Sequence, residues 1–141
     1  MKIYIPTRGR PYSQETLKWF PKEMQIDGSV VLVIDEDEKD KYYKYKDTPK
    51  MVVPEDCIGI GPKRKYIVEN TEDPRIVMLD DDLRFYIRKS PTDWHLRYLE
   101  SSEYPALFGL FDEWMDQGYA HCGISAREGN NRVEDLSVEN T

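Results

Sequence analysis

The feature that most constrains the fold of this chain is an apolar run at residues 29–34, Ser-Val-Val-Leu-Val-Ile. A strand that is apolar at successive positions, rather than at every second one, is typical of a strand buried on both faces in a parallel sheet. Residues 3–5, 51–53 and 75–79 are further short strand candidates, and 75–79 is again expected to be fully buried. The chain is therefore predicted to contain a largely parallel sheet.

Helical patterns separate these strand candidates. Helices are expected at 14–20 with Ser13 as N-cap, at 38–46 on the surface, at 62–70 beginning with Pro62, and from Ser102 to Gly118. The last helix is amphipathic, and its stripe of Tyr104, Phe108, Phe111 and Met115 is expected in the core. Two further strands are expected at 84–88 and 119–124, with Trp94 in a loop between them. Alternating strands and helices predict an α/β fold in which helices flank the sheet.

Residues able to bind a charged ligand follow each of the first four strand candidates. In parallel α/β sheets, ligands bind outside the carboxyl ends of the strands, so these loops are expected to converge on one edge of the sheet. In chain order the candidates are Pro6, Thr7, Arg8 and Arg10, then Asp35 and Glu36, then Gly61, Lys63 and Arg64, and finally Asp80, Asp81 and Asp82.

The aspartate run, Asp80–Asp82, is the strongest candidate for a metal site. Three adjacent carboxylates repel one another unless a cation is near. Mg²⁺ and Mn²⁺ prefer oxygen ligands and commonly use one or two carboxylates together with substrate phosphates. In extended backbone, residues i and i+2 point the same way, so Asp80 and Asp82 are predicted to share the ion while Asp81 points elsewhere. The alternative is a solvated acidic turn.

The basic residues at the strand ends are candidates for phosphate binding. Arg8 and Arg10 can form bidentate hydrogen bonds to phosphate or stack on a base. Lys63 and Arg64 follow a glycine-rich turn that leads into a helix, and the free N–H groups of a helix N-terminus favour anions. Asp35 can accept a hydrogen bond from a ribose hydroxyl or a base N–H. For each of these residues a solvated surface position is the alternative.

The charge and composition of the chain exclude some classes of binding partner. Residues 1–98 carry 18 basic and 18 acidic side chains, whereas residues 99–141 carry two arginines against nine acids, which gives the net charge of −7. This distribution argues against broad nucleic-acid binding but leaves room for a small local patch. No apolar run approaches the ~20 residues that span a bilayer, so no membrane association is expected. Cys57 and Cys122 are expected to be reduced thiols of a cytoplasmic protein.

The order of these motifs resembles a known family. Ile-Pro-Thr-Arg-Gly-Arg at 5–10 and Met-Leu-Asp-Asp-Asp-Leu at 78–83 are similar to glycosyltransferases of the GT-A type, in particular to the TET-associated glycosyltransferases of bacteriophages. Those enzymes are thought to add sugars to modified pyrimidines in phage DNA. The resemblance covers about residues 3–90 and, more loosely, 118–132. It implies a Rossmann-like GT-A nucleotide-sugar-binding fold, with 1–98 as the nucleotide-sugar-binding part and 99–141 as the start of the acceptor part of one domain.

The resemblance also implies roles for the candidate residues. The donor is expected to be a nucleoside diphosphate sugar, UDP-linked, and the acceptor a molecule such as modified DNA in the cytoplasm of the host cell. Asp80 and Asp82 are expected to hold Mn²⁺ or Mg²⁺ on the diphosphate, where the metal offsets the charge on the leaving group. The nucleotide sugar itself is expected to contact Pro6, Thr7, Arg8, Arg10, Asp35, Glu36, Gly61, Lys63, Arg64, Asp80 and Asp81.

Three interpretations of the C-terminal region remain open, since GT-A enzymes usually continue further. The chain is a truncated fragment, a reduced enzyme whose acceptor site is completed by a protein partner, or a non-catalytic module that binds a nucleotide or a partner. Asp112 and Glu113 are the late candidates for a general base, and their place on a core helix disfavours both. A phosphoacceptor receiver domain is disfavoured as well, because arginines follow the first strand where that fold requires acids.

Overall fold

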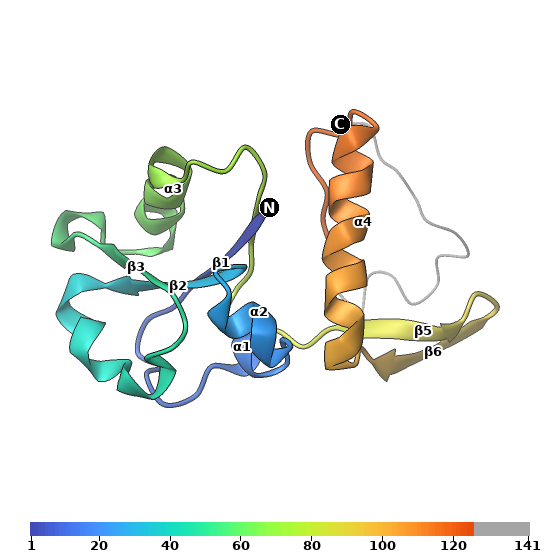
Figure 1. Ribbon diagram of the computed structural model, residues 1–141, viewed down its shortest axis with the longest axis horizontal. Coiled ribbons are helices and arrows are strands. Elements are labelled where there is room, and N and C mark those ends of the chain that lie inside the picture. Colours follow the sequence, from blue (N-terminus) through green and yellow to red (C-terminus); the bar gives the residue numbers. More distant parts are fainter. Residues whose placement is uncertain (126–141) are drawn as a thin grey trace. The chain divides into compact units, whose positions relative to one another are not determined.

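The computed structural model describes residues 1–125 and divides into two compact units, Met1–Arg84 and a second unit that begins at Phe85 (Figure 1). The division falls after Arg84 rather than after residue 98, because residues 86–98 pair with one another in a local hairpin. Among the described residues, no helix is long and apolar enough to cross a membrane.

The first unit is built on a four-stranded parallel sheet with the order β3-β2-β1-β4. The strands are β1 (Lys2–Pro6), β2 (Val30–Asp35), β3 (Lys50–Val53) and β4 (Ile76–Met78). In the centre of the sheet, Ile3 of β1 is paired with Val30 of β2 on one side and with Val77 of β4 on the other. The prediction of an α/β fold with a parallel sheet is confirmed, and the order is that of the first four strands of a Rossmann-type sheet.

The burial of the strands follows their positions in the sheet. Every residue of β2 is buried, as its continuous apolar run predicts. All three residues of β4 are only partly buried, so the expectation of a fully buried fourth strand is wrong. Among the described residues β4 pairs with β1 alone, which leaves it at an edge of the sheet.

Helices lie on both sides of this sheet, with α3 (Ile60–Asn70) on one side and α1 (Glu15–Lys18) and α2 (Lys22–Ile26) on the other (Figure 1). The core on the α3 side consists of Tyr4, Val31, Val33, Val53 and Ile67. Residues of the opposite pleat, Ile3, Ile5, Val30, Leu32 and Ile34, are equally buried. The layers predicted from the sequence are therefore present.

Helix boundaries in the first unit differ from the predictions in two places. The predicted helix at 14–20 ends early and is followed by α2, because Pro21 begins a new helix; its N-cap is Gln14 rather than Ser13. The helix at 62–70 begins at Ile60 instead, after Gly59 with φ +101° as N-cap. Pro62 is thus the third helical residue, where its missing N–H is still harmless.

The predicted surface helix at 38–46 is replaced by two short 3₁₀ helices, η1 (Glu36–Lys41) and η2 (Tyr43–Tyr45). Tyr42 separates them, and its side chain is almost fully buried and donates a hydrogen bond to Glu38 Oε2 at 3.3 Å. The backbone of Tyr42, with φ −87° and ψ 32°, is not helical and separates the two segments. A third 3₁₀ helix, η3, covers Glu55–Cys57.

The second unit contains a hairpin and a long helix. The strands β5 (Tyr86–Ser90) and β6 (Asp93–Tyr98) pair antiparallel, and η4 (Ser101–Glu103) leads into α4 (Tyr104–Asp116). The expected strand near 84–88 and the amphipathic helix are confirmed, while β6 replaces the predicted loop around Trp94. The helix α4 begins after Glu103 rather than after Ser102 and has no side-chain cap of its own, and residues 119–124 form no strand.

Candidate active site

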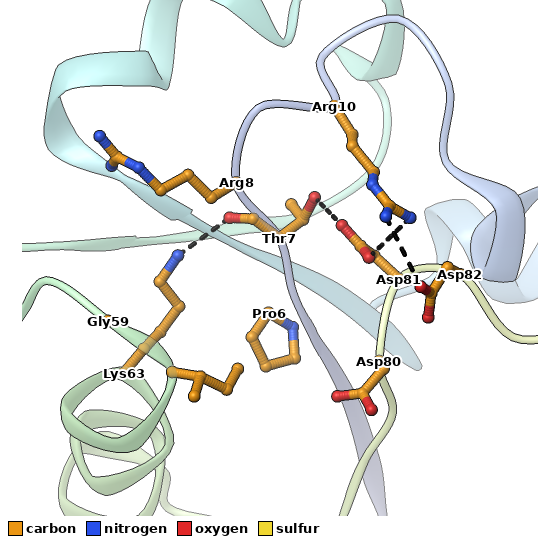
Figure 2. Close-up of a pocket in the computed structure, with 10 residues that line it drawn as sticks. Pro6, Thr7, Arg8, Arg10, Gly59, Lys63, Asp80, Asp81 and Asp82 are labelled. Atoms are coloured by element: carbon orange, nitrogen blue, oxygen red, sulfur yellow. Dashed lines mark hydrogen bonds and ion pairs between the residues drawn. The ribbon is translucent and has the colours of Figure 1, made fainter.

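A cavity of about 310 Å³ opens at the carboxyl edge of the sheet, between the loops that follow β1 and β4 (Figure 2). From β1 the chain continues to β2 on one side, whereas β4 lies on the other side of β1, so the cavity lies at the topological switch point of the sheet. Ligands of open α/β sheets bind at such points. The lining residues are Pro6, Thr7, Arg8, Arg10, Gly59, Ile60, Lys63, Asp80, Asp81 and Asp82.

Thr7 connects the two loops that border the cavity. Its hydroxyl donates to Asp81 Oδ2 at 2.6 Å and accepts from Gln14 Nε2 at 2.9 Å. Its backbone N–H donates to Val33 O at 3.0 Å, which ties the loop to β2. Because the side chain is almost fully buried, these bonds fix the distance between the β1 loop and the aspartate run.

Lys63 and Asp35 form a buried ion pair beneath the β1 loop. Lys63 Nζ donates to Asp35 Oδ2 and to Thr7 O, both at 2.9 Å, and each of the paired side chains is only 4% exposed. The helical spacing of α3 places Lys63 on the same inward face as Ile67. Asp35 Oδ1 is buried without a hydrogen-bond partner among the described residues, so it is an acceptor still available to a donor.

Arg8 is held outside the centre of the cavity. Its guanidinium donates to Asp35 Oδ2 at 2.8 Å and to both carboxylate oxygens of Asp37, at 3.0 and 3.2 Å. The hydrogen bonds to Asp37 and to Asp35 raise the pKa of Arg8 further above its ordinary value. Figure 2 shows the side chain directed away from the aspartate run. Arg8 therefore connects the loop after β1 to η1.

The aspartate run is paired with two arginines. Arg10 Nη1 lies 3.1 Å from Asp81 Oδ1, and Arg10 Nη2 lies 3.5 Å from Asp82 Oδ2. Asp80 turns the other way and accepts from Arg64 Nη2 at 2.8 Å. Asp81 and Asp82 thus converge on one cation (Figure 2), because the chain makes a turn here and the i, i+2 rule of extended backbone does not apply. The assignment of Asp80 and Asp82 as metal ligands stays a prediction.

Three buried polar residues that sequence reasoning did not identify hold this arrangement in place. Thr16 accepts from Leu83 N at 2.8 Å and donates to Asp80 O at 2.5 Å, which clamps both ends of the aspartate run. Gln14 binds Thr7 and Arg10 O, and the carboxylate of Glu38 accepts from Gly9 N. For Gln14 and Thr16 the available signal was a polar residue beside Leu17 in a helix predicted to bury one face, and no such signal exists for Glu38.

Some of the predicted binding residues lie outside the cavity. Gly61 lines a separate cavity of about 370 Å³ with Cys57 and Pro62, and Glu36 is paired with Lys39 in η1. Arg64 reaches the site only through Asp80. His95 lies at the exposed hairpin beside Asp93, and Cys57 and Cys122 are free thiols.

The carboxylates in the cavity are of the kind that bind a divalent cation when a bound ligand supplies the remaining oxygen atoms. Within residues 1–125, no group of three or more His, Cys, Asp or Glu side chains converges as a ready-made metal cage. Mg²⁺ and Mn²⁺ sites do not need one, since they often combine one or two carboxylates with phosphate oxygens and water. In this structure the Arg10 guanidinium contacts both Asp81 and Asp82.

A parallel sheet of this order, with a charged cavity at its switch point, defines a Rossmann-like α/β ligand-binding domain. The model of the TET-Associated Glycosyltransferase family matches residues 1–135, and the chain therefore belongs to this family of glycosyltransferases. The resemblance seen in the sequence is thereby confirmed. Comparison with curated proteins gives no significant match, and neither does comparison with solved structures.

Proposed function

We propose that this chain is a metal-dependent glycosyltransferase that takes its sugar from a nucleoside diphosphate sugar, UDP-linked, and transfers it to an acceptor such as modified DNA. One observation carries the proposal: a single cavity at the switch point of the sheet combines carboxylates able to hold Mn²⁺ or Mg²⁺ with groups able to bind a diphosphate. Membership of the glycosyltransferase family supports the class of reaction.

The diphosphate is expected to lie between the N-terminus of α3 and Arg10. Gly59 and Ile60 bring the first turn of this 11-residue helix to the cavity, and its unpaired N–H groups favour phosphate oxygens. Arg10 offers a planar guanidinium from the opposite side (Figure 2). A bound metal would supply Lewis-acid stabilisation of the departing diphosphate.

The nucleoside is expected to lie near the Lys63–Asp35 pair. The unpartnered Asp35 Oδ1 is a buried acceptor adjacent to the β1 loop, and a base N–H or a ribose hydroxyl is a donor of the kind it lacks. Lys63 holds this carboxylate in place, since its ammonium donates to the other oxygen.

A non-catalytic nucleotide-binding module of the same fold is the second candidate. The observation that favours it is the absence of an unengaged carboxylate in the cavity: Asp80, Asp81 and Asp82 are all ion-paired in the described structure. The late candidates Asp112 and Glu113 lie on α4 in the second unit. Such a module, with or without a protein partner that completes the acceptor site, binds the nucleotide and forms no product.

The distinguishing experiment is a turnover assay with UDP-sugars and Mn²⁺, in the presence and absence of modified DNA. We expect release of UDP, and a loss of about 100-fold or more in Asp82→Ala, because the metal would lose a ligand. Glu23→Ala is the matched control, since it also removes one exposed acid but lies on α2. Nucleotide binding without any product favours the second candidate, and unchanged turnover in Asp82→Ala contradicts the metal site.

A further inference from the structure

Two arginine side chains already offset two of the three negative charges of the aspartate run. Arg10 spans Asp81 and Asp82, and Arg64 pairs with Asp80. We propose that Arg10 is an exchangeable counter-ion: it holds these carboxylates until a divalent cation binds, and its guanidinium then moves to the phosphates of the nucleotide. This inference rests on the proposed function, because it assumes that the cavity takes both a metal and a diphosphate.

The ion pairs of Arg10 with Asp81 and Asp82 can break without loss of the fold. The Arg10 side chain is 44% exposed and that of Asp82 57%, so water competes for both groups. At 3.1 and 3.5 Å, Arg10 contacts one oxygen of each carboxylate and forms a bidentate pair with neither. Exposed ion pairs of this kind contribute little to stability. Their loss is therefore compatible with an intact fold.

Arg8 provides the contrast within the same loop. Its guanidinium contacts both oxygens of Asp37 and also the buried Asp35, so it is held at three points. Arg10 has no comparable anchor, and its backbone is fixed independently, since Gln14 Nε2 donates to Arg10 O at 2.9 Å. The side chain can thus turn without moving the loop.

The metal and Arg10 compete for the same atoms. Thr7 holds Asp81 Oδ2 at 2.6 Å, so the oxygen that remains on this residue is Oδ1, which Arg10 contacts. On Asp82, Arg10 contacts Oδ2, an exposed oxygen on the predicted metal ligand. A cation bound to Asp82, alone or with a neighbouring carboxylate, therefore weakens the hold on Arg10 by like-charge repulsion.

The released arginine has a second partner within reach. Arg10 lines the cavity in which the diphosphate is proposed to lie, and guanidinium matches phosphate in bidentate geometry. Metal binding thus converts Arg10 from a carboxylate partner into a phosphate partner. The exchange couples the two ligands, because each removes the competitor of the other.

The test measures Mn²⁺ alone and UDP with Mn²⁺ by calorimetry, on the full chain and on Arg10→Gln. We expect Arg10→Gln to bind Mn²⁺ alone about three- to tenfold more tightly, since a competing cation is gone, and to bind UDP with Mn²⁺ about tenfold more weakly, since a phosphate ligand is gone. Lys22→Gln is the control: it removes one positive charge at an exposed position of α2 and should leave both affinities within about twofold.

The exchange predicts opposite changes in Arg10→Gln: tighter binding of Mn²⁺ alone and weaker binding of UDP with Mn²⁺. If Arg10→Gln binds Mn²⁺ no more tightly than the unmodified chain, the inference is overturned even where UDP still binds. If both affinities fall, Arg10 only shapes the loop, and Arg10→Lys, which keeps the charge, should then restore neither. If the unmodified chain binds neither Mn²⁺ nor UDP, the proposed function fails as well, which separates the two failures.

Discussion

At the scale of single residues, the cavity depends on polar groups that bind one another beneath the surface. Lys63, Asp35 and Thr7 form one such group: a single ammonium joins the carboxylate at the end of β2 to the backbone at the end of β1. Both charged partners are nearly inaccessible to water. Removing one partner of a buried pair leaves the other charge uncompensated, which is far more harmful than losing an exposed pair.

We therefore expect Lys63→Met to lower the free energy of unfolding by about 2–4 kcal/mol. The loss should be smaller than for a buried charge left with no partner, because Arg8 still contacts Asp35. Urea denaturation measures the change. Lys65→Met on the same helix is the matched control, since that side chain is 74% exposed and its change should stay within about 0.5 kcal/mol. A loss below about 1 kcal/mol in Lys63→Met would contradict the role of the pair.

The sequence identified these residue types but not their partners. Thr7, Asp35, Lys63 and the aspartate run were predicted as ligand-binding residues because they follow buried strands, and the structure brings them to one edge of the sheet. Hydrogen-bond partners depend on side-chain directions in loops and turns, which periodicity does not determine. For this reason the Arg10 contact with Asp81, and the clamp of Thr16 on the aspartate run, could not be predicted.

At the scale of elements, η4 is stabilised by a capping box between Glu100 and Glu103, directly before α4. The Glu103 side chain accepts from Glu100 N at 2.8 Å, and the Arg97 guanidinium forms a two-point contact with Glu103 at 2.6 and 2.7 Å. The bonds to Arg97 and to the Glu100 N–H lower the pKa of Glu103 to about 2. Glu103 thus connects β6 to the start of the helix.

This lowered pKa predicts a specific dependence on pH. A carboxylate whose pKa is lower in the folded chain than its ordinary 4.5 stabilises the fold above that value, and the contribution is lost as pH falls from about 4.5 towards 2. We expect Glu103→Gln to be less stable than the unmodified chain at pH 7, with the difference shrinking below about pH 4.5. Denaturation at a series of pH values tests this, and a difference that is independent of pH would contradict it.

Elements with strong periodicity were predicted well, and those defined by tertiary contacts were not. The buried run of β2 appears as expected, and so does the stripe of Tyr104, Phe108 and Phe111 on α4, although Met115 is only partly buried. The strand β6 was missed because its pairing with β5 supplies the strand structure, not its own pattern. The helix predicted at 38–46 is wrong, because the backbone leaves the helical conformation at Tyr42 and the segment forms two 3₁₀ helices.

At the scale of the whole molecule, the order of the strands creates the site. Four parallel strands in the order β3-β2-β1-β4 place the loops after β1 and β4 side by side, and the cavity opens between them. The sequence predicted a parallel sheet and a shared ligand edge, but four short strands are compatible with several orders. The order, and hence the pairing of the β1 loop with the aspartate run, follows only from the structure.

The central claim, that this cavity is a metal-dependent nucleotide site, is tested most directly by calorimetric titration of UDP and a panel of other nucleotides with and without Mn²⁺. We expect UDP binding that requires the metal and is abolished in Asp82→Ala. Glu23→Ala should bind UDP as the unmodified chain does, because Asp82 lies in the cavity and Glu23 does not. If no nucleotide binds under either condition, or if Asp82→Ala binds normally, the claim is contradicted.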